Sequence, residues 1–461
     1  MNGPQAHRSA IISPGNALIL LGLIAGIALY HAARGERSAP APDDYAKFAY
    51  AVATWGTFGF PDDSTRAPAP SVGRAPLYPL FLAGMMQLSP TYASLVTGYV
   101  DGEETTDEPD AGIVPYVQMA IMATVAFVLF AIARLFGSRP VFAHACAAVA
   151  LVPLLDIAFK YRLSEALAVP LFALASLCLV LWFMDRDRPR RRYLFLAGLV
   201  LGLAALTRTV HVTYLPFVLL AVLLLPTAAG GRPAVRRRLA GGLLLLAGFA
   251  IVVAPWVGRN VALQGSPAIG AGGADGVLAW RAAYNTMSPA EALAAGVYWL
   301  PGFGDSLARS LFPERAWRRL DFSHPDGFRA RGWATLQQVR RDHADGGERR
   351  AELRRLVLAD PAGHLVATLP LAVRGLRHVW IFLPFAVYAL WRVRRQPVFP
   401  PLIGAGVLTV ATFVVHAGIT HFRGRYGLPM VVGFAPLAAL GLTILSGWRS
   451  GEARRSDPLL Q

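Results

Sequence analysis

Two adjacent carboxylates, Asp43 and Asp44, stand just past the first long apolar run of the chain. That run carries no Asp, Glu, Lys or Arg from residue 9 to residue 33 and is long enough to cross a bilayer. The pair therefore lies where a membrane helix would emerge, at the start of a long polar loop. A carboxylate held at such a point could act as a general base towards an attacking hydroxyl.

A second set of ionisable residues falls at the predicted outer ends of other apolar runs, and arginines dominate it. The centres of the runs carry almost no charge, whereas an ion-coupled transporter would place carboxylates near the bilayer midplane. Guanidinium forks suit phosphate oxygens, so the distribution favours a site for a lipid phosphate headgroup at the outer membrane face. The candidates are Asp156, Glu165, Arg208, Arg259, Arg425 and Tyr426.

Most of these residues also have a plain structural explanation. Asp43 or Asp44 could cap a helix, and Glu165 could complement a helix dipole. Asp156 could form a salt bridge within its own turn, and Arg208 could extend to the membrane interface.

Composition argues against nucleic acid as a partner and does not decide whether the protein binds a metal ion. The net charge of +16 would suggest nucleic acid in a soluble protein. Here the arginine clusters flank apolar runs, where they mark topology and contact anionic lipids, so we expect membrane lipids and no nucleic acid as partners. No cofactor is indicated with certainty. A divalent cation stays open, since His211, His416 and His421 could ligate one together with a carboxylate.

The apolar runs predict the fold class. The chain is 55% hydrophobic, and such runs recur from end to end. We predict an all-α polytopic membrane protein with about ten transmembrane helices and two large periplasmic loops carrying interfacial helices. The apolar segment at residues 76–88 is too short for a span and is expected along the membrane surface. The expected spans are 12–31, 112–133, 141–155, 166–184, 193–207, 210–226, 239–257, 376–391, 398–415 and 428–445.

With ten spans, the five arginine clusters, four in short links and one after the last span, fall on one side of the membrane, which makes that side and both termini cytoplasmic. We expect an N-terminal membrane module at 1–257, which includes the first periplasmic loop at 32–111. A second large loop at 258–375 and C-terminal helices with a cytoplasmic tail at 376–461 follow. An acidic patch at 101–110 lies in the first loop and has no assigned role.

Several short motifs in this order resemble those of GT-C class membrane glycosyltransferases of the protein O-mannosyltransferase and lipid A aminoarabinose transferase (family 39) type. The resemblance covers nearly the whole chain. The chain departs from it at the acidic pair, since many members carry Asp-Glu where this sequence has Asp-Asp. The motifs lie at 43–45, 74–83, 164–165, 202–208, 255–260, 265–267 and 425–429.

The resemblance implies an inverting transferase of the bacterial inner membrane. It would use a polyprenyl-phosphate sugar and act at the periplasmic face on an envelope acceptor: lipid A, a glycan, another lipid or a protein. Asp43 matches the first acid of the family pair and is the first choice for the base, while Asp44 would orient the acceptor or a metal. Two alternatives remain, a flippase for lipid-linked sugars and a non-catalytic scaffold protein. We expect the acidic pair to share one hollow with Arg208 and Arg425.

Overall fold

The computed structural model describes residues 12–33, 44–61, 65–103, 112–185, 190–228, 235–270, 273–421 and 424–449. Within these ranges the regular elements are helices, and the β-pairing is one isolated bridge between Gly59 and Pro70. The predicted all-α class is confirmed. Asp43 and residues 104–110 of the acidic patch lie outside the described ranges.

Helix length and hydropathy support a polytopic membrane protein. Among the described residues six helical segments are long and apolar enough to span a membrane, and two bent helix pairs could raise the number to eight. The expected count of about ten is therefore not confirmed. The six are α1 (Pro14–Ala33), α5 (Val114–Leu135), α6 (Pro140–Lys160), α7 (Glu165–Phe183), α10 (Val235–Gln264), and η5 (Gly424–Met430) continued by α21 (Val431–Arg449) to Gly447.

Three expected spans appear as shorter apolar helices. They are α8 (Arg192–Thr207), η2 (Thr209–Tyr214) continued by α9 (Leu215–Leu224), and α18 (Leu383–Val393). The bent pairs are α16 (Gly346–Leu358) with α17 (Pro361–Gly375) and η4 (Leu376–His378), and α19 (Phe399–Ala405) with α20 (Val407–Gly418). The pair of α16 and α17 falls in the predicted second loop. It was not predicted as a span because the charged residues of α16 lower the local hydropathy.

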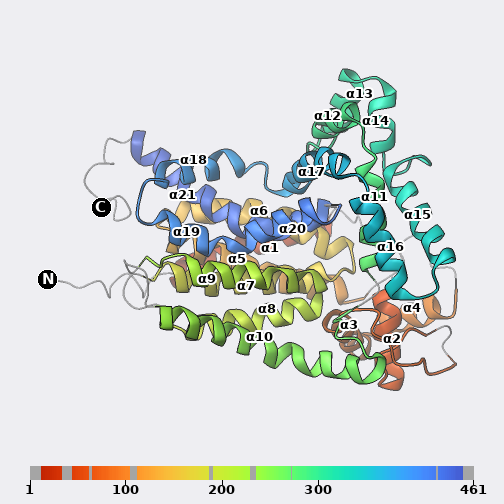
Figure 1. Cartoon of the computed structure of the whole chain (residues 1–461). Coiled ribbons are helices and arrows are strands. Elements are labelled where there is room, and N and C mark those ends of the chain that lie inside the picture. The colour runs from red at the N-terminus through yellow and green to blue at the C-terminus, as the bar shows by residue number, and fades with distance from the viewer. Residues whose placement is uncertain are drawn as a thin grey trace. The chain divides into compact units, whose positions relative to one another are not determined.

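The chain forms two compact units (Figure 1). The first unit comprises Met1–Gly270, Ile381–Thr409 and Val431–Gln461. The second unit comprises Ala271–Trp380 and Val410–Met430. The three modules expected from the sequence follow chain order, and their boundaries stay a prediction.

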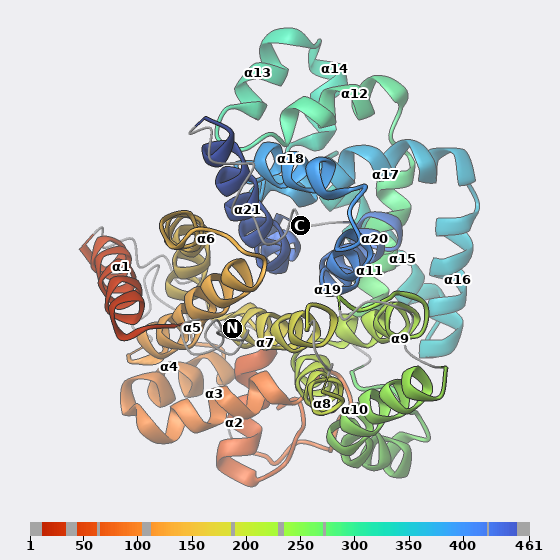
Figure 2. The same ribbon diagram turned by 90° about the vertical axis from the view of Figure 1, so that its left-hand side faces the viewer.

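Glycine residues allow α8 and α10 of the first unit to approach each other closely. A Cβ atom on Gly198 of α8 would overlap the carbonyl oxygen of Leu245 in α10, and one on Gly248 would overlap that of Phe195. Close approach of this kind is typical of membrane helices. In Figure 2, which looks along the long helices, α8 lies beside α7 on one side and α10 on the other.

A small layer of helices follows α1 in the first unit: α2 (Asp44–Trp55), α3 (Leu77–Leu88) and α4 (Pro90–Val100). Its core contains Ala49, Tyr78, Leu82, Tyr92 and Val96, all buried. The helix at 77–88 confirms the apolar helix expected there. Its position along the membrane surface stays a prediction.

The second unit is built around α11 (Ala274–Asn285), which packs against α15 (Phe328–Asp342) and α16. Their shared core contains Ala279, Leu336, Val339 and Leu353. A further group comprises α12 (Pro289–Tyr298), α13 (Gly304–Leu311), α14 (Glu314–Trp317) and η3 (Arg318–Leu320).

Candidate functional site

Asp44 is the first residue of α2 and forms an ion pair with Arg74. An Arg74 Nη2 donates to Asp44 Oδ2 at 2.6 Å, and the guanidinium carbon lies 5.2 Å from the centre of the Tyr45 ring. The carboxylate is half exposed. Asp44 therefore sits at a helix N-terminus, where a negative charge is stabilised, with one guanidinium beside it. Its sequence neighbour Asp43 lies outside the described residues.

The next residue joins α2 to the start of α7. The Tyr45 hydroxyl donates to Ser164 Oγ across 3.5 Å, and Ser164 immediately precedes Glu165, the first residue of α7. The Tyr45 ring also packs edge-on against Tyr78 at 5.2 Å, and the Tyr78 hydroxyl donates to Gln118 at 2.7 Å. These contacts fix the acidic end of α2 against α3, α5 and α7.

Glu165 is buried and pairs with Arg208. Its side chain is 3% exposed and that of Arg208 is 18% exposed, and an Arg208 Nη1 contacts Glu165 Oε1 directly. Arg208 is the C-cap residue of α8, and its carbonyl lies 3.1 Å from His211 Nδ1. Removing two charges from water is costly unless they neutralise each other, which explains why two partly buried charges meet here.

These contacts connect six residues in a continuous series within the first unit, which we call the acid–arginine row. The row has a guanidinium at each end and a carboxylate next to each guanidinium. A hydrogen bond between the Tyr45 and Ser164 hydroxyl groups joins its two halves, and Asp44–Tyr45 and Ser164–Glu165 are neighbours in the sequence. It brings together Asp44, Glu165 and Arg208 from the predicted site residues and adds three that the sequence did not single out as site residues. Its members are Arg74, Asp44, Tyr45, Ser164, Glu165 and Arg208.

Two other predicted residues of the first unit have structural contacts. Arg259 donates to the carbonyls of Ser71 and Phe58 at 3.2 Å each and lies 4.5 Å from the Trp256 ring centre, so it holds the loop before α3. Asp156 pairs with Lys160 at 3.0 Å and His31 at 3.6 Å. The salt bridge offered as the alternative for Asp156 is present.

Arg425 and Tyr426 belong to η5 in the second unit. The Arg425 guanidinium carbon lies 5.8 Å from the centre of the Tyr426 ring. That ring contacts the imidazoles of His416 at 5.1 Å and His421 at 5.7 Å. The hollow expected to join Arg425 to the acidic pair stays a prediction.

Arg281 of α11 is a fully buried cation that sequence reasoning missed, since nothing in its neighbourhood marks the position as buried. Its guanidinium donates to the carbonyls of Ala417, Thr420 and His364, to Thr368 Oγ1 and to His364 Nδ1, at 2.6 to 3.3 Å. Burial lowers the pKa of Arg281 to about 10. These bonds hold the end of α20, and hence the start of the segment that carries Tyr426, against α11 and α17.

The residues that the structure describes contain no group of three or more His, Cys, Asp or Glu side chains placed to hold a metal ion. His416 and His421 both contact Tyr426, whereas His211 lies beside Arg208 in the first unit. The divalent cation considered from the sequence stays a prediction.

Comparison with known proteins gives one structural match. No protein-family model matches the chain, and no curated protein matches its sequence. Among solved structures, the oligosaccharyltransferase of the archaeon Archaeoglobus fulgidus, crystallised with a tethered acceptor peptide, is similar at 12% sequence identity and a TM-score of 0.47. The match covers 95% of this chain and 52% of the archaeal chain, so this chain spans about half the length of that protein.

Proposed function

We propose that this protein is a GT-C class glycosyltransferase that moves a sugar from a polyprenyl-phosphate donor to an envelope acceptor at the periplasmic face of a bacterial inner membrane. The acid–arginine row is the observation that supports this proposal most. It gathers carboxylates and guanidiniums at the ends of α2, α7 and α8, in a chain whose long helices are apolar. The motif resemblance of the sequence supports the class.

The row, together with Asp43, the sequence neighbour of Asp44, offers the groups that such a transfer needs. The acceptor oxygen attacks the anomeric carbon while the bond from that carbon to the donor phosphate oxygen breaks, which inverts the anomeric centre. A carboxylate of the Asp43–Asp44 pair takes the acceptor proton. A guanidinium stabilises the charge that develops on the leaving lipid phosphate, and Arg208 is the candidate.

The present pairing of Arg208 with Glu165 sets a condition on this role. A phosphate would have to share the Arg208 guanidinium with the Glu165 carboxylate. Glu165 would then orient Arg208 and would not itself contact the donor. Arg259, Asp156, Arg425 and Tyr426 remain candidate donor contacts on the strength of the resemblance.

The test measures turnover in proteoliposomes that are supplied with a polyprenyl-phosphate sugar. The quantity measured is the amount of polyprenyl phosphate released. Asp43→Asn and Asp44→Asn are compared with Asp326→Asn, a matched exchange at an exposed position of the second unit. Loss of a general base typically costs 10²- to 10⁴-fold, so at least one of the first two variants should lose about 100-fold or more in rate while still binding the donor. Full activity in both would exclude the acidic pair as the base.

The same preparation separates the alternatives. A flippase would move labelled donor between leaflets without releasing polyprenyl phosphate, and a scaffold protein would do neither. Mass spectrometry of envelope glycolipids and glycans, with and without the gene, would identify the sugar and the acceptor.

A further inference from the structure

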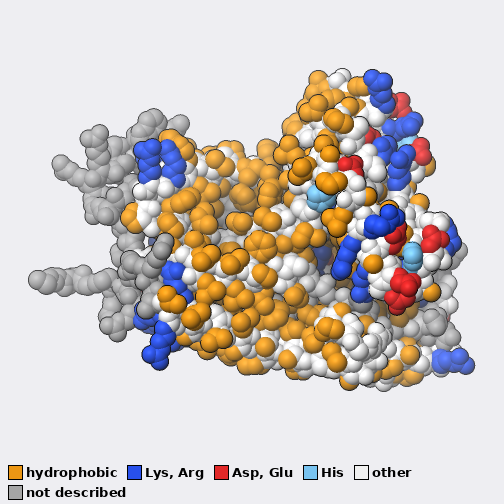
Figure 3. Space-filling model, in the orientation of Figure 1, with side chains coloured by type: hydrophobic (Ala, Val, Ile, Leu, Met, Phe, Trp, Pro, Cys, Tyr) orange, Lys and Arg blue, Asp and Glu red, His pale blue; other side chains and the backbone are white. Residues whose placement is uncertain are grey.

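The second unit carries an exposed apolar surface that the proposed reaction does not use. Helices α12 and α13 form a hairpin on which Leu293, Phe303 and Leu311 are 70%, 55% and 62% exposed. Phe303 and Leu311 fall on one stripe with Leu307, because residues four apart lie on the same face of a helix. In Figure 3 hydrophobic side chains gather on one side of the α12–α14 group and charged side chains on the other.

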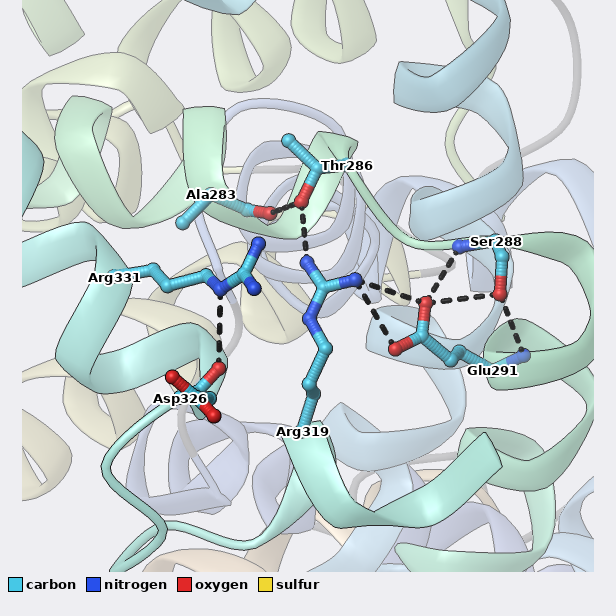
Figure 4. A network of polar contacts seen from close by, with 7 residues as sticks. All are labelled: Ala283, Thr286, Ser288, Glu291, Arg319, Asp326 and Arg331. Atoms are coloured by element: carbon cyan, nitrogen blue, oxygen red, sulfur yellow. Dashed lines mark hydrogen bonds and ion pairs between the residues drawn. The ribbon is translucent and has the colours of Figure 1, made fainter. Parts of the chain in front are cut away.

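Packing holds this hairpin in a fixed shape. Gly302 adopts a φ of 86° at the turn, and a Cβ on Gly304 would overlap the carbonyl oxygen of Val297, so the two helices approach closely. At the base of α12, Glu291 accepts from the Ser288 amide and hydroxyl at 2.8 and 2.9 Å and pairs with Arg319 at 3.2 Å (Figure 4). The exposed apolar side chains therefore belong to a built element with a buried ionic anchor.

A second exposed apolar surface adjoins the hairpin within the same unit. Leu365 and Leu369 of α17 are 72% and 73% exposed and lie one helical turn apart. Helix α12 packs against α17, and Arg374 of α17 lies 4.8 Å from the centre of the Trp299 ring at the end of α12. The pair formed by α16 and α17 has the hydropathy of a membrane span, bent by 86°.

We propose that these five side chains, the apolar ridge of Leu293, Phe303, Leu311, Leu365 and Leu369, rest in the interfacial region of the lipid bilayer. Large apolar side chains that are more than half exposed on helices packed together mark a contact with a membrane or a partner. The hydropathy of α17 identifies lipid as the occupant, since Leu365 and Leu369 belong to an element composed like a membrane segment. The hairpin extends that surface, and α14 and η3, which pack against α12, carry the exposed residues Arg315 and Arg318, whose side chains can reach the headgroup level.

The test measures the depth of the ridge in proteoliposomes of the full chain. Cys146 and Cys178 are first replaced by alanine, and single cysteines at Phe303, Leu293 or Leu369 then carry a bimane label. A cysteine at Arg340, exposed on α15, serves as the matched control. Nitroxide on lipid acyl chains near the headgroup should quench the three ridge labels at least twofold, whereas aqueous iodide should quench the Arg340 label preferentially.

Each outcome decides the proposal. Iodide quenching at the ridge equal to that at residue 340 would show that the ridge faces water. Protection from both quenchers would show that protein covers it, and either result overturns the proposal. Because the ridge lies on three helices, α12, α13 and α17, failure of one variant to fold leaves the other positions informative. The measurement does not depend on glycosyl transfer.

Discussion

Replacing Glu165 by glutamine should destabilise the first unit by ~3–5 kcal/mol, the usual cost of removing one partner of a buried ion pair. The magnitude follows from burial: 3% of the Glu165 side chain and 18% of the Arg208 side chain are exposed, so little water can replace the lost carboxylate. The change is nearly isosteric, which limits any contribution from packing.

The matched control is the exposed pair of the same row. Asp44 and Arg74 are 49% and 29% exposed, and Asp44→Asn should therefore cost less than about 1 kcal/mol. Unfolding in mild detergent with increasing denaturant measures both variants. The reasoning is refuted if Glu165→Gln costs no more than Asp44→Asn.

A double-mutant cycle then separates structure from function. The variant that combines Glu165→Gln with Arg208→Gln carries no unpaired charge, so it should be more stable than the sum of the single effects predicts, with a coupling of about 2 kcal/mol or more. If Arg208 also contacts the donor phosphate, the stabilised double variant should still lack turnover. Recovery of both stability and turnover would assign the pair a purely structural role.

Two further predictions concern the second unit. Arg281→Leu should destabilise it by about 3 kcal/mol or more, because several buried acceptors lose their donor together. Thermal unfolding, detected by the labelling of buried cysteines introduced into α11, would measure the loss of stability. Hydrogen bonds from the amides of Glu348 and Gly347 lower the pKa of Asp345 below 3.8, so the cap on α16 is fully formed above that pH and is lost as pH falls through the lower folded-state pKa. Amide exchange of α16 between pH 2.5 and 6 should show protection falling at the acid end in the wild type and no such change in Asp345→Ala.

The sequence predicted where the helices lie along the chain better than it predicted which side chains contact one another. Apolar run length identifies α1, α5, α6 and α7, since each is long enough to span by itself. It did not single out the bent pair of α16 and α17, because the charged residues of α16 dominate the local composition there. Mean hydropathy taken over a window of sequence combines the charged residues of α16 with the apolar residues of α17. In the folded chain a sharp bend separates these two helices.

The candidate site shows the same limit. The resemblance singled out Asp44, Glu165 and Arg208, and the motifs quoted for it include Arg74, Tyr45 and Ser164. However, it did not show that Asp44 pairs with Arg74, or that Tyr45 reaches Ser164, a residue 119 positions further on. Those contacts depend on how α2 lies against α7, and no local pattern determines that.

The pairing within the row bears on how a donor phosphate could bind. Arg74 and Arg208 each already contact a carboxylate, so the row as folded carries little excess positive charge. A phosphate arriving at Arg208 must weaken the contact with Glu165, and its binding energy is reduced by that amount. The base of the proposed reaction belongs to the Asp43–Asp44 pair, and Asp44 pairs with Arg74, whereas Arg208 pairs with Glu165. Exchanging Arg208 should therefore lower the rate of turnover through donor binding and leave the pH dependence set by the base unchanged.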